Sequence, residues 1–246
     1  EAAVGGGIPL IRPLSESLAG ERIDRVLGIV NGTTNFILTA MASEGRSYDD
    51  VLAEAQRLGF AEADPTADVG GHDAAAKAAI LAGLAFGVWV GGDGVYREGI
   101  ERIDTRDIAF ARQLGFGIKL LAVAESTPDG VAVRVHPSLV PLDHPLANVR
   151  GAYNAVFIEG PALGELFFTG PGAGGDPTAT AVLGDVIDAA RELLAGTQVV
   201  PRIRFGPGVV LPFDKVLTQW YIRVEVTDSP GVLAKVAGVF GEAGVS

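Results

Sequence analysis

Apolar side chains recur at helical spacing in the first part of the chain. In residues 47–59 they fall on one face, and Ser47 followed three residues later by Asp50 is typical of a helix beginning. Gly59 marks the end, because glycine readily adopts the left-handed conformation that follows many helices. The sequence therefore predicts an amphipathic helix here, with its apolar face formed by Val51, Leu52, Ala55 and Leu58.

Two further helices are predicted on either side of a polar loop at residues 61–72. One covers residues 34–42, and the other begins at Asp73, where alanine becomes frequent. The uncharged residues 78–92 continue the second helix, but they are fewer than the ~20 that cross a bilayer. We therefore expect a buried helix and no membrane association.

Alternating and continuous apolar runs predict strands elsewhere. Residues 22–32 are rich in β-branched side chains, and Asn31 with Gly32 is expected to close this strand as a turn. Later runs are separated by Pro, Gly and Asp. Helices followed by clustered strands favour an α+β fold over a regular βαβ winding. The later strands are predicted at 118–125, 131–135, 155–160 and 165–170.

The last third of the chain predicts a long helix and a separate small element. Residues 179–194 are amphipathic, and a Pro- and Gly-rich connector follows at 202–215. Residues 221–246 then predict a strand, a turn and a helix. Both ends of the chain are interpreted as cuts within a longer protein. Without a partner, the helix of residues 179–194 would expose an apolar face formed by Val182, Ile187, Ala190 and Leu194.

Composition excludes several classes of function. The chain has 246 residues, 48% hydrophobic, and a formal net charge of -11, so it can bury a sizeable core and no basic surface is expected for nucleic acid. It contains no cysteine, which removes disulfides, thiolate metal sites and cysteine nucleophiles. A reducing, cytoplasmic location fits this composition.

Asp73 and Lys77 are the first candidates for catalysis. They are four residues apart on the alanine-rich helix and therefore share one face. A solvated ion pair is one interpretation. The alternative is that apolar neighbours desolvate Lys77, which would lower its pKa toward proton transfer while Asp73 orients it.

The loop before this helix adds Glu62, Asp64 and Asp68. Such a group is ordinarily just a hydrophilic loop. Beside a helix N-terminus it can instead be held in place by partial positive charge and accept the ammonium of a substrate.

A glycine-rich stretch at residues 170–177 lies between a predicted strand and the last long helix. Its backbone amides could approach phosphate closely, but Asp176 before Pro177 is typical of a helix cap and would repel an anion. By itself this stretch is a weak signal, and a complete dinucleotide site cannot be built from it. His72, His136 and His144 have no metal-ligand spacing, so solvated or core roles are preferred.

The opening residues EAAVGGGI form a second glycine-rich turn. A hard cation on oxygen ligands is the more plausible metal here, with the Glu1 carboxylate and main-chain carbonyls as the ligands.

Six segments resemble homoserine dehydrogenase in the same order along residues 1–195. They are EAAVGGGIP, GIVNGTTNFIL, LGFAEADPTADVGGHDAAAKAAILA, IKLLA, HPLANVRGAYNAV and GPGAGGDPTATAVLGDV. The resemblance implies an NAD(P)-dependent interconversion of L-homoserine and L-aspartate 4-semialdehyde, in the pathway to threonine, methionine and isoleucine. It also implies an α+β fold in which a mixed sheet is covered by helices, and a homodimer built through the strands of residues 118–169.

The same resemblance assigns roles to individual residues. Lys77 corresponds to the proton donor and acceptor at the substrate oxygen, with Asp73 beside it. Glu62, Asp68 and Asp73 correspond to substrate-binding acids, and Gly174 with Gly172 corresponds to the cofactor contact. Glu1 through its side chain, and Val4, Gly6 and Ile8 through their carbonyls, correspond to a site for Na⁺ or K⁺.

The resemblance also divides the chain. Residues 1–168 are expected to form the substrate-binding, catalytic and dimerisation domain, and 169–196 the glycine loop and helix that return to a nucleotide-binding domain mostly missing here. Residues 197–217 are a predicted linker, and 218–246 resemble the first half of an ACT domain, of βαβ type. Because the residues that meet the ribose 2′ position are missing, NAD and NADP stay open alternatives.

A competing interpretation is a non-catalytic amino-acid-binding or dimerisation module. In that case the acidic loop and the sheet would serve ligand capture and assembly alone. Lys77 distinguishes the enzyme from the non-catalytic module, because capture of an amino acid needs carboxylates but no buried proton donor.

Overall fold

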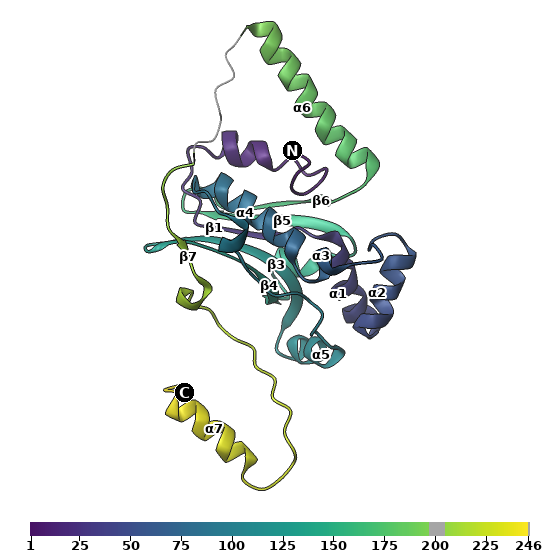
Figure 1. The fold of residues 1–246 in the computed structure, drawn as a ribbon, viewed down its shortest axis with the longest axis vertical. Coiled ribbons are helices and arrows are strands. Elements are labelled where there is room, and N and C mark those ends of the chain that lie inside the picture. Colours follow the sequence, from purple (N-terminus) through teal and green to yellow (C-terminus); the bar gives the residue numbers. More distant parts are fainter. Residues whose placement is uncertain (197–204, 246) are drawn as a thin grey trace.

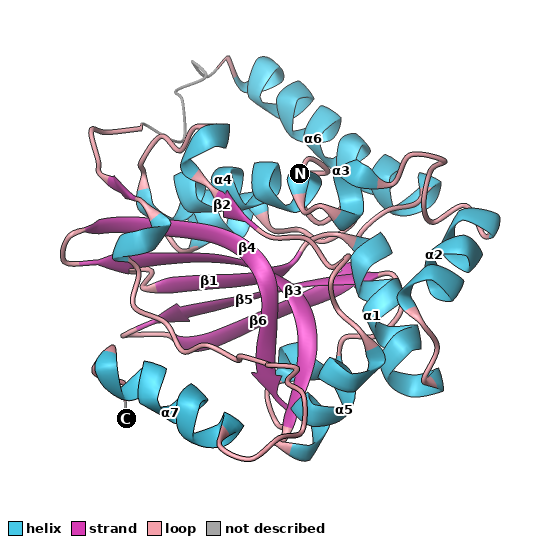
Figure 2. Ribbon diagram, turned by 60° about the horizontal axis from the view of Figure 1, so that its bottom comes forward, coloured by secondary structure: helices cyan, strands magenta, loops and turns pink. Residues whose placement is uncertain are grey.

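A curved sheet forms the centre of the molecule (Figures 1 and 2). The computed structural model describes residues 1–196 and 205–245. Six strands follow the order β2-β4-β3-β1-β5-β6, and β7 pairs with β4. The pairs β2–β4 and β4–β7 are parallel and the others antiparallel, so the sheet is mixed. The strands are β1 Arg25–Ile29, β2 Tyr96–Arg97, β3 Phe116–Thr127, β4 Gly130–Pro141, β5 Tyr153–Gly160, β6 Gly164–Pro171 and β7 Val210–Leu211.

Helices cover one face of this sheet, and α1, α2, α3 and α5 gather at one end of it (Figure 1). The α+β prediction is confirmed. The long helices are α1 Gly32–Glu44, α2 Tyr48–Arg57, α4 His72–Phe86, α5 Thr105–Gln113, α6 Gly175–Ala195 and α7 Val232–Glu242. Shorter ones are η1 Pro13–Ser17, α3 Thr66–Val69, η2 Gly92–Gly94, η3 Pro145–Asn148 and η4 Phe213–Lys215. No helix within the described ranges combines the length and apolar character that a bilayer crossing requires.

The core lies on both faces of the sheet. On the helix side, α1, α4 and the first residues pack against β1, β3, β4 and β5, with Leu10, Ile37 and Leu81 at most 1% exposed. Burying each such side chain contributes roughly 1.5–3 kcal/mol. On the opposite face a smaller cluster, including Phe157, packs under Leu146 of η3. One part of the second sheet face is therefore covered by the chain itself.

Local capping explains where the first helices begin. Ser47 caps α2 by accepting from the N–H of Asp50, as the sequence predicts, and Gly59 follows the helix with a φ of +79°. The prediction that Asn31 and Gly32 form a turn is wrong. Asn31 is extended, caps α1 through the N–H of Thr34, and Gly32 is already helical, so the strand leads into the helix after two residues.

The predicted helix over residues 78–92 is only partly correct. Helix α4 begins at His72 and ends at Phe86, where Gly87 takes a left-handed φ of +65°. Beyond it, Val88 forms a bridge with Gly206. The glycine therefore ends the helix although the apolar composition continues, because its missing Cβ makes the left-handed cap inexpensive.

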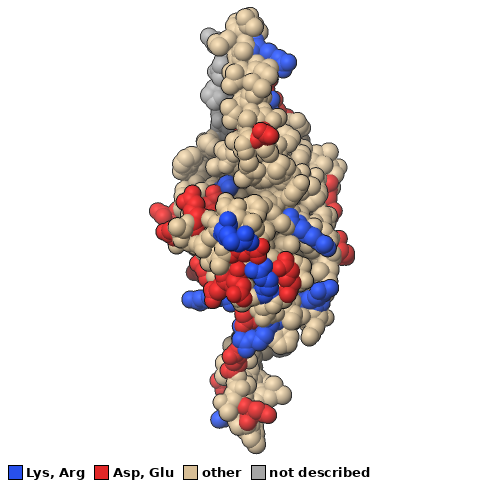
Figure 3. All heavy atoms as spheres, turned by 90° about the vertical axis from the view of Figure 1, so that its right-hand side faces the viewer, with Lys and Arg blue, Asp and Glu red and all other residues tan. Residues whose placement is uncertain are grey.

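Helix α6 projects from the sheet as a long arm (Figure 1). Its apolar face is exposed as predicted, with Val182 at 50%, Ile187 at 42% and Leu194 at 90%. In Figure 3 the charged side chains gather over the middle of the visible face, and the arm at the top carries few. Strand β6 continues past the boundary predicted at residues 168–169 and ends at Pro171.

The predicted strand at the start of the last element is wrong, whereas its helix α7 is confirmed. Residues 221–226 are extended but pair with no strand among the described residues. A strand requires a neighbouring edge for its main-chain hydrogen bonds. Here the segment is instead held by side chains, since Arg223 pairs with Asp104 and Asp107 at the beginning of α5. The predicted linker at 197–217 lies partly outside the described residues.

Candidate active site

The side chain of Lys77 extends from α4 to the segment between the end of β1 and the start of α1. Its Nζ donates to the carboxylate of Asp73 over 2.7 Å and to the carbonyl of Val30 over 3.0 Å. The first contact confirms that Asp73 and Lys77 share one face of α4. The second comes from the packing of α4 on the sheet. The Lys77 side chain stays 22% exposed, so a ligand can reach the ammonium from one side.

Asn31 connects this lysine pair to the loop before α4. It is 5% exposed, and its Nδ2 lies 2.6 Å from Asp68 Oδ1 and 3.0 Å from Asp73 Oδ2. Its Oδ1 accepts from the N–H and the hydroxyl of Thr34. Sequence analysis missed this residue, although an asparagine between a strand and a helical pattern is also a frequent helix cap.

Asp68 is fixed from two sides. Besides the amide of Asn31, the hydroxyl of Thr33 lies 3.1 Å from Asp68 Oδ2 and 2.6 Å from the carbonyl of Phe60. The short helix α3 carries Asp68 toward the start of α1. The structure therefore places Asp68, Asp73 and Lys77 in one hydrogen-bonded group, which we call the lysine–carboxylate group.

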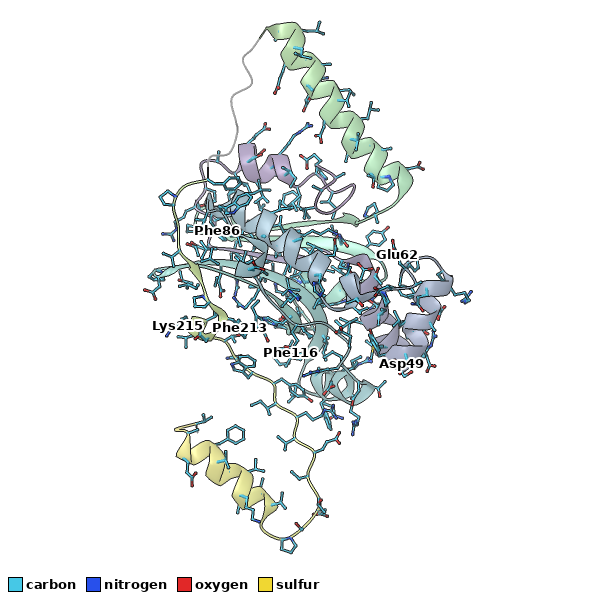
Figure 4. All side chains as sticks on the ribbon, viewed as in Figure 1. Asp49, Glu62, Phe86, Phe116, Phe213 and Lys215 are labelled. Carbon is cyan, nitrogen blue, oxygen red and sulfur yellow. The ribbon has the colours of Figure 1, made fainter. Side chains whose placement is uncertain are left out.

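Glu62 and Asp64 differ from Asp68 in their contacts. Asp64 Oδ1 accepts from the hydroxyl and the N–H of Thr66, and the hydroxyl bond holds the pKa of this carboxyl below its usual value. Glu62 is exposed, on the side of the molecule where α1, α2 and α3 lie (Figure 4). Among the described residues, no hydrogen bond or ion pair engages the Glu62 carboxylate. Its side chain is therefore available to a ligand.

Carboxylates outnumber the single ammonium in and around the lysine–carboxylate group. Glu62, Asp68 and Asp73 carry negative charge, and Lys77 pairs directly with Asp73 alone. Partial burial lowers the local dielectric and strengthens such fields. The arrangement favours a ligand that brings its own positive group toward the acids and an oxygen toward Lys77.

The glycine loop of residues 171–175 lies at the end of β6. A Cβ on Gly172 would come within 2.1 Å of Asn154 Cγ, so only glycine fits there. Gly174 has φ +126° and ψ +151° and is the residue before α6. The prediction that Asp176 caps this helix is wrong, because the helix already begins at Gly175 and Asp176 lies in its first turn.

The opening turn packs on this glycine loop. A Cβ on Gly6 would meet the carbonyl oxygen of Gly172 at 2.4 Å, and Gly7 donates its N–H to the carbonyl of Pro171. Glu1 is engaged by chain contacts, since its carboxylate accepts from the N–H groups of residues 10, 11 and 12. The carbonyls of Val4, Gly6 and Ile8 accept no hydrogen bond among the described residues. These carbonyls and the Glu1 side chain belong to the same opening turn, and carbonyl and carboxylate oxygens are the ligands that hard cations take.

The three histidines make no hydrogen bond to the lysine–carboxylate group among the described residues. His136 is held in the sheet, where burial lowers the pKa of its ring, and His144 caps η3 through Nδ1 while contacting Phe157. His72 is exposed at the start of α4. Within the described ranges, no three His, Asp or Glu side chains are arranged to hold a metal ion.

A cavity of about 500 Å³ lies elsewhere, at the hairpin end of the sheet. It is lined by the loop before β1, the end of α4 and the turn between β3 and β4, including Arg22 and Asp129. Lys77 lies at the other end of β1, beside Val30. The cavity therefore does not contribute to the lysine–carboxylate group.

Fold and site together define an α+β domain that presents a lysine, several carboxylates and a glycine loop at one end of a mixed sheet. Comparison with known proteins agrees. The sequence model of the homoserine dehydrogenase family matches residues 9–187. The chain belongs to the homoserine dehydrogenase family.

Several relatives show how far the similarity extends. The chain is 52% identical to a homoserine dehydrogenase of Corynebacterium glutamicum and 53% identical to one of Mycobacterium tuberculosis, in each case over 100% of this chain. It covers 56% and 57% of those proteins, so it spans a little over half the length of these curated relatives.

Solved structures give the same result. A crystal structure of a homoserine dehydrogenase from Thiobacillus denitrificans matches with a TM-score of 0.86 and 42% identity, over 99% of this chain and 57% of that one. A hyperthermophilic archaeal homoserine dehydrogenase mutant in complex with NADPH matches with a TM-score of 0.68 and 35% identity, over 83% of this chain and 56% of that one.

Proposed function

We propose that this chain is the substrate-binding and catalytic part of an NAD(P)-dependent homoserine dehydrogenase, which interconverts L-homoserine and L-aspartate 4-semialdehyde. The observation that carries the proposal is the position of Lys77, held 2.7 Å from Asp73 and 3.0 Å from the Val30 carbonyl while partly open to solvent. The competing role as a pure amino-acid-binding module does not require a lysine fixed in this way.

Oxidation of the homoserine alcohol removes one proton from its oxygen and one hydride from its carbon. A bound nicotinamide would supply the acceptor for the hydride. Lys77 is suited to the proton, because its Nζ is fixed by two acceptors and still faces solvent. In the oxidation the neutral amine of Lys77 accepts the alcohol proton, and the ammonium so formed releases it to solvent. In the reverse direction the ammonium protonates the aldehyde oxygen.

The surrounding acids hold the rest of the substrate. Glu62 has a carboxylate without chain partners in the described part, and Asp68 follows it six residues later in α3. Charge-assisted hydrogen bonds from the homoserine ammonium to such carboxylates are stronger than neutral ones. Asp73 orients Lys77, so recognition and proton transfer are joined through the lysine–carboxylate group.

The residues of the two glycine-rich turns fit the implied cofactor and cation. Gly172 and Gly174 lie between the end of β6 and α6, and the carbonyls of Val4, Gly6 and Ile8, with the Glu1 carboxylate, are oxygen ligands of the kind that Na⁺ or K⁺ takes. We further propose that a nucleotide-binding domain outside this chain covers α6. The exposed apolar face of that helix supports this proposal.

Three other assignments stay predictions. A homodimer through the exposed sheet is supported by Tyr153 and Phe167, which are 55% and 39% exposed on β5 and β6. Light scattering of the complete enzyme at micromolar concentration should give twice the chain mass. An ACT domain at residues 218–246 and a place in threonine, methionine and isoleucine synthesis in the cytoplasm rest on the family resemblance.

The decisive experiment uses the complete enzyme with its nucleotide-binding domain. Homoserine-dependent reduction of NADP⁺ or NAD⁺ is followed by absorbance in the wild type and in Lys77→Ala. We expect the wild type to reduce the cofactor and the variant to lose about a hundredfold or more in kcat. Circular dichroism checks that the variant is folded. A wild type that binds homoserine but reduces neither cofactor would favour the non-catalytic module.

A further inference from the structure

Asn154 carries a buried polar group that the fold leaves unpaired. The residue is 1% exposed, and its Oδ1 has no hydrogen-bond partner among the described residues. Other buried amides of the chain are satisfied. Asn35, 2% exposed, donates to main-chain carbonyls of residues 149–153 and accepts from Lys119, and Asn31 is paired through both ends of its amide. Three other buried side-chain atoms of the described residues are also unpaired, Thr39 Oγ1 in α1 and Arg134 Nε and His136 Nε2 in β4. Asn154 differs from them because it lies on β5 against the glycine loop, where a partner from outside the chain is expected.

The sheet register places Asn154 beside the lysine–carboxylate group. Strands β1 and β5 pair antiparallel, and their last registered pair at this end is Ile29 with Ala155. The next residues on the two strands are Val30 and Asn154. The Val30 carbonyl is the acceptor for Lys77 Nζ. Side chains two residues apart on a strand share a face, so Asn154 points to the helix side together with the buried Val156.

The glycine loop lies on the other side of the same amide. An ideal Cβ on Gly172 would stand 2.1 Å from Asn154 Cγ and 2.3 Å from both its Oδ1 and Nδ2. The bare backbone of Gly172 therefore covers the amide, and any side chain at this position would displace it. Asn154 lies between the lysine–carboxylate group and the glycine loop of residues 171–175.

We propose that Asn154 binds the carboxamide of the nicotinamide ring, with Oδ1 accepting from the carboxamide N–H. The proposal rests on the proposed function, and it adds a residue that positions the cofactor. Hydride transfer requires the ring to lie against the substrate carbon next to the oxygen that Lys77 serves. The ring can reach that place between Lys77 and the glycine loop, and its carboxamide is the substituent that forms hydrogen bonds there.

The chemistry of the amide favours this ligand over the substrate ammonium. A carboxamide offers a donor NH₂ group and an acceptor oxygen, which match the acceptor Oδ1 and donor Nδ2 of an asparagine. The homoserine ammonium has stronger acceptors in the carboxylates of Glu62 and Asp68. Access to Oδ1 requires the backbone at Gly172 to withdraw, and glycines at 170, 172, 174 and 175 give the loop the conformational freedom to do so.

The test compares two cofactors that differ only at the carboxamide. NADPH and the reduced 3-acetylpyridine analogue, in which a methyl group replaces the amide NH₂, are titrated into the complete enzyme without homoserine, and Kd is measured by calorimetry. We expect the wild type to bind NADPH about threefold to tenfold more tightly than the analogue. In Asn154→Ala the affinity for NADPH should fall by more than that for the analogue, which has only its carbonyl oxygen to pair with Asn154 Nδ2, so the ratio approaches one.

Two further variants serve as controls. Asn154→Asp keeps an acceptor and should retain part of the discrimination, which also covers the case in which Asn154→Ala does not fold. Thr169→Val removes the hydroxyl that donates to the Asn154 carbonyl from the neighbouring strand and should leave the ratio unchanged. Thermal unfolding of each variant checks the fold.

The outcomes separate this proposal from the proposed function. Equal affinity of the wild type for both cofactors, or full discrimination in Asn154→Ala, overturns the role of Asn154 while homoserine oxidation still stands. Weaker homoserine binding in Asn154→Ala with unchanged cofactor discrimination assigns the residue to the substrate and also overturns it. A wild type that binds no NADPH and oxidises no homoserine overturns both.

Discussion

The side-chain amide of Asn31 donates a hydrogen bond of 2.6 Å to the carboxylate of Asp68. These residues are 37 positions apart, and the contact fastens the loop before α4 to the end of β1. The same nitrogen lies 3.0 Å from Asp73, the partner of Lys77. One amide therefore sets the spacing between an acid proposed to hold the substrate and the acid that orients the proposed proton donor.

Asn31 should be as important for turnover as the charged residues it joins. In Asn31→Ala both carboxylates lose a donor and α1 loses its cap, so we expect kcat/KM to fall about tenfold to a hundredfold and stability by about 1 kcal/mol. Asn31→Ser is the matched control. Serine can still cap Thr34 but is too short to reach both acids, so stability should recover and activity should not. Recovery of both would assign Asn31 to capping alone.

Glu62 is expected to act on substrate binding rather than on chemistry. Glu62→Gln should raise KM for homoserine about tenfold or more with a smaller change in kcat, because a neutral amide replaces a charged acceptor for the ammonium. Asp64→Asn is the control in the same exposed loop, where the carboxylate already accepts from Thr66. Steady-state kinetics should show little change in KM there. Equal effects in both variants would indicate a general loss of negative charge.

The opening turn should make activity depend on a small monovalent cation. The carbonyls of Val4, Gly6 and Ile8 and the Glu1 carboxylate belong to the opening turn, which packs on the glycine loop through Gly6. A bound ion would thus stabilise the cofactor side of the site. Replacing Na⁺ and K⁺ by a bulky organic cation should lower the rate of the complete enzyme severalfold. An unchanged rate would count against the site.

The chain alone should show no measurable homoserine oxidation. Its proposed proton donor and acids are in place, but hydride transfer requires the nicotinamide to be held against the substrate. We propose that the domain which holds it lies outside this chain, and the exposed apolar face of α6 supports this proposal. Homoserine and NADP⁺ are added to the purified chain and absorbance of the reduced cofactor is followed. Sustained reduction near the rate of the complete enzyme would show that the cofactor site is complete within these residues.

Lys119 should make the free energy of unfolding depend on pH, and substituting this residue should remove that dependence. Burial lowers the pKa of its ammonium to about 8, and the charge of Arg150 adds to the effect. Between pH 8 and 10.5 the unfolded chain keeps a proton that the folded protein has released, so the free energy of unfolding rises with pH from this group. The free energy of unfolding of the wild type, measured in urea, should therefore rise by about 1–3 kcal/mol relative to that of Lys119→Met across this pH window. Parallel pH profiles would contradict the assignment.

Patterns that depend on a few neighbouring residues determined much of this protein in advance. Helix α2 has its cap at Ser47 and its stop at Gly59, and Asp73 meets Lys77 because a helix brings residues four apart onto one face. Strands β1, β3, β4, β5 and β6 follow from apolar runs that are bounded by turn residues, whereas the two-residue strands β2 and β7 were not predicted. Where a local pattern allowed two structures, as at Asn31 and at residues 221–226, the sequence interpretation failed.

Contacts between distant segments were decided by the tertiary structure alone. The carbonyl of Val30 receives Lys77 because α4 packs across β1, and Asn154 faces Gly172 because β5 and β6 pair in one register. No periodicity encodes which backbone atom or amide such packing leaves unpaired. The sequence by itself thus determined the chemical groups of the site, and the tertiary structure decided their partners, because sheet register and helix packing are set by the burial of the whole core.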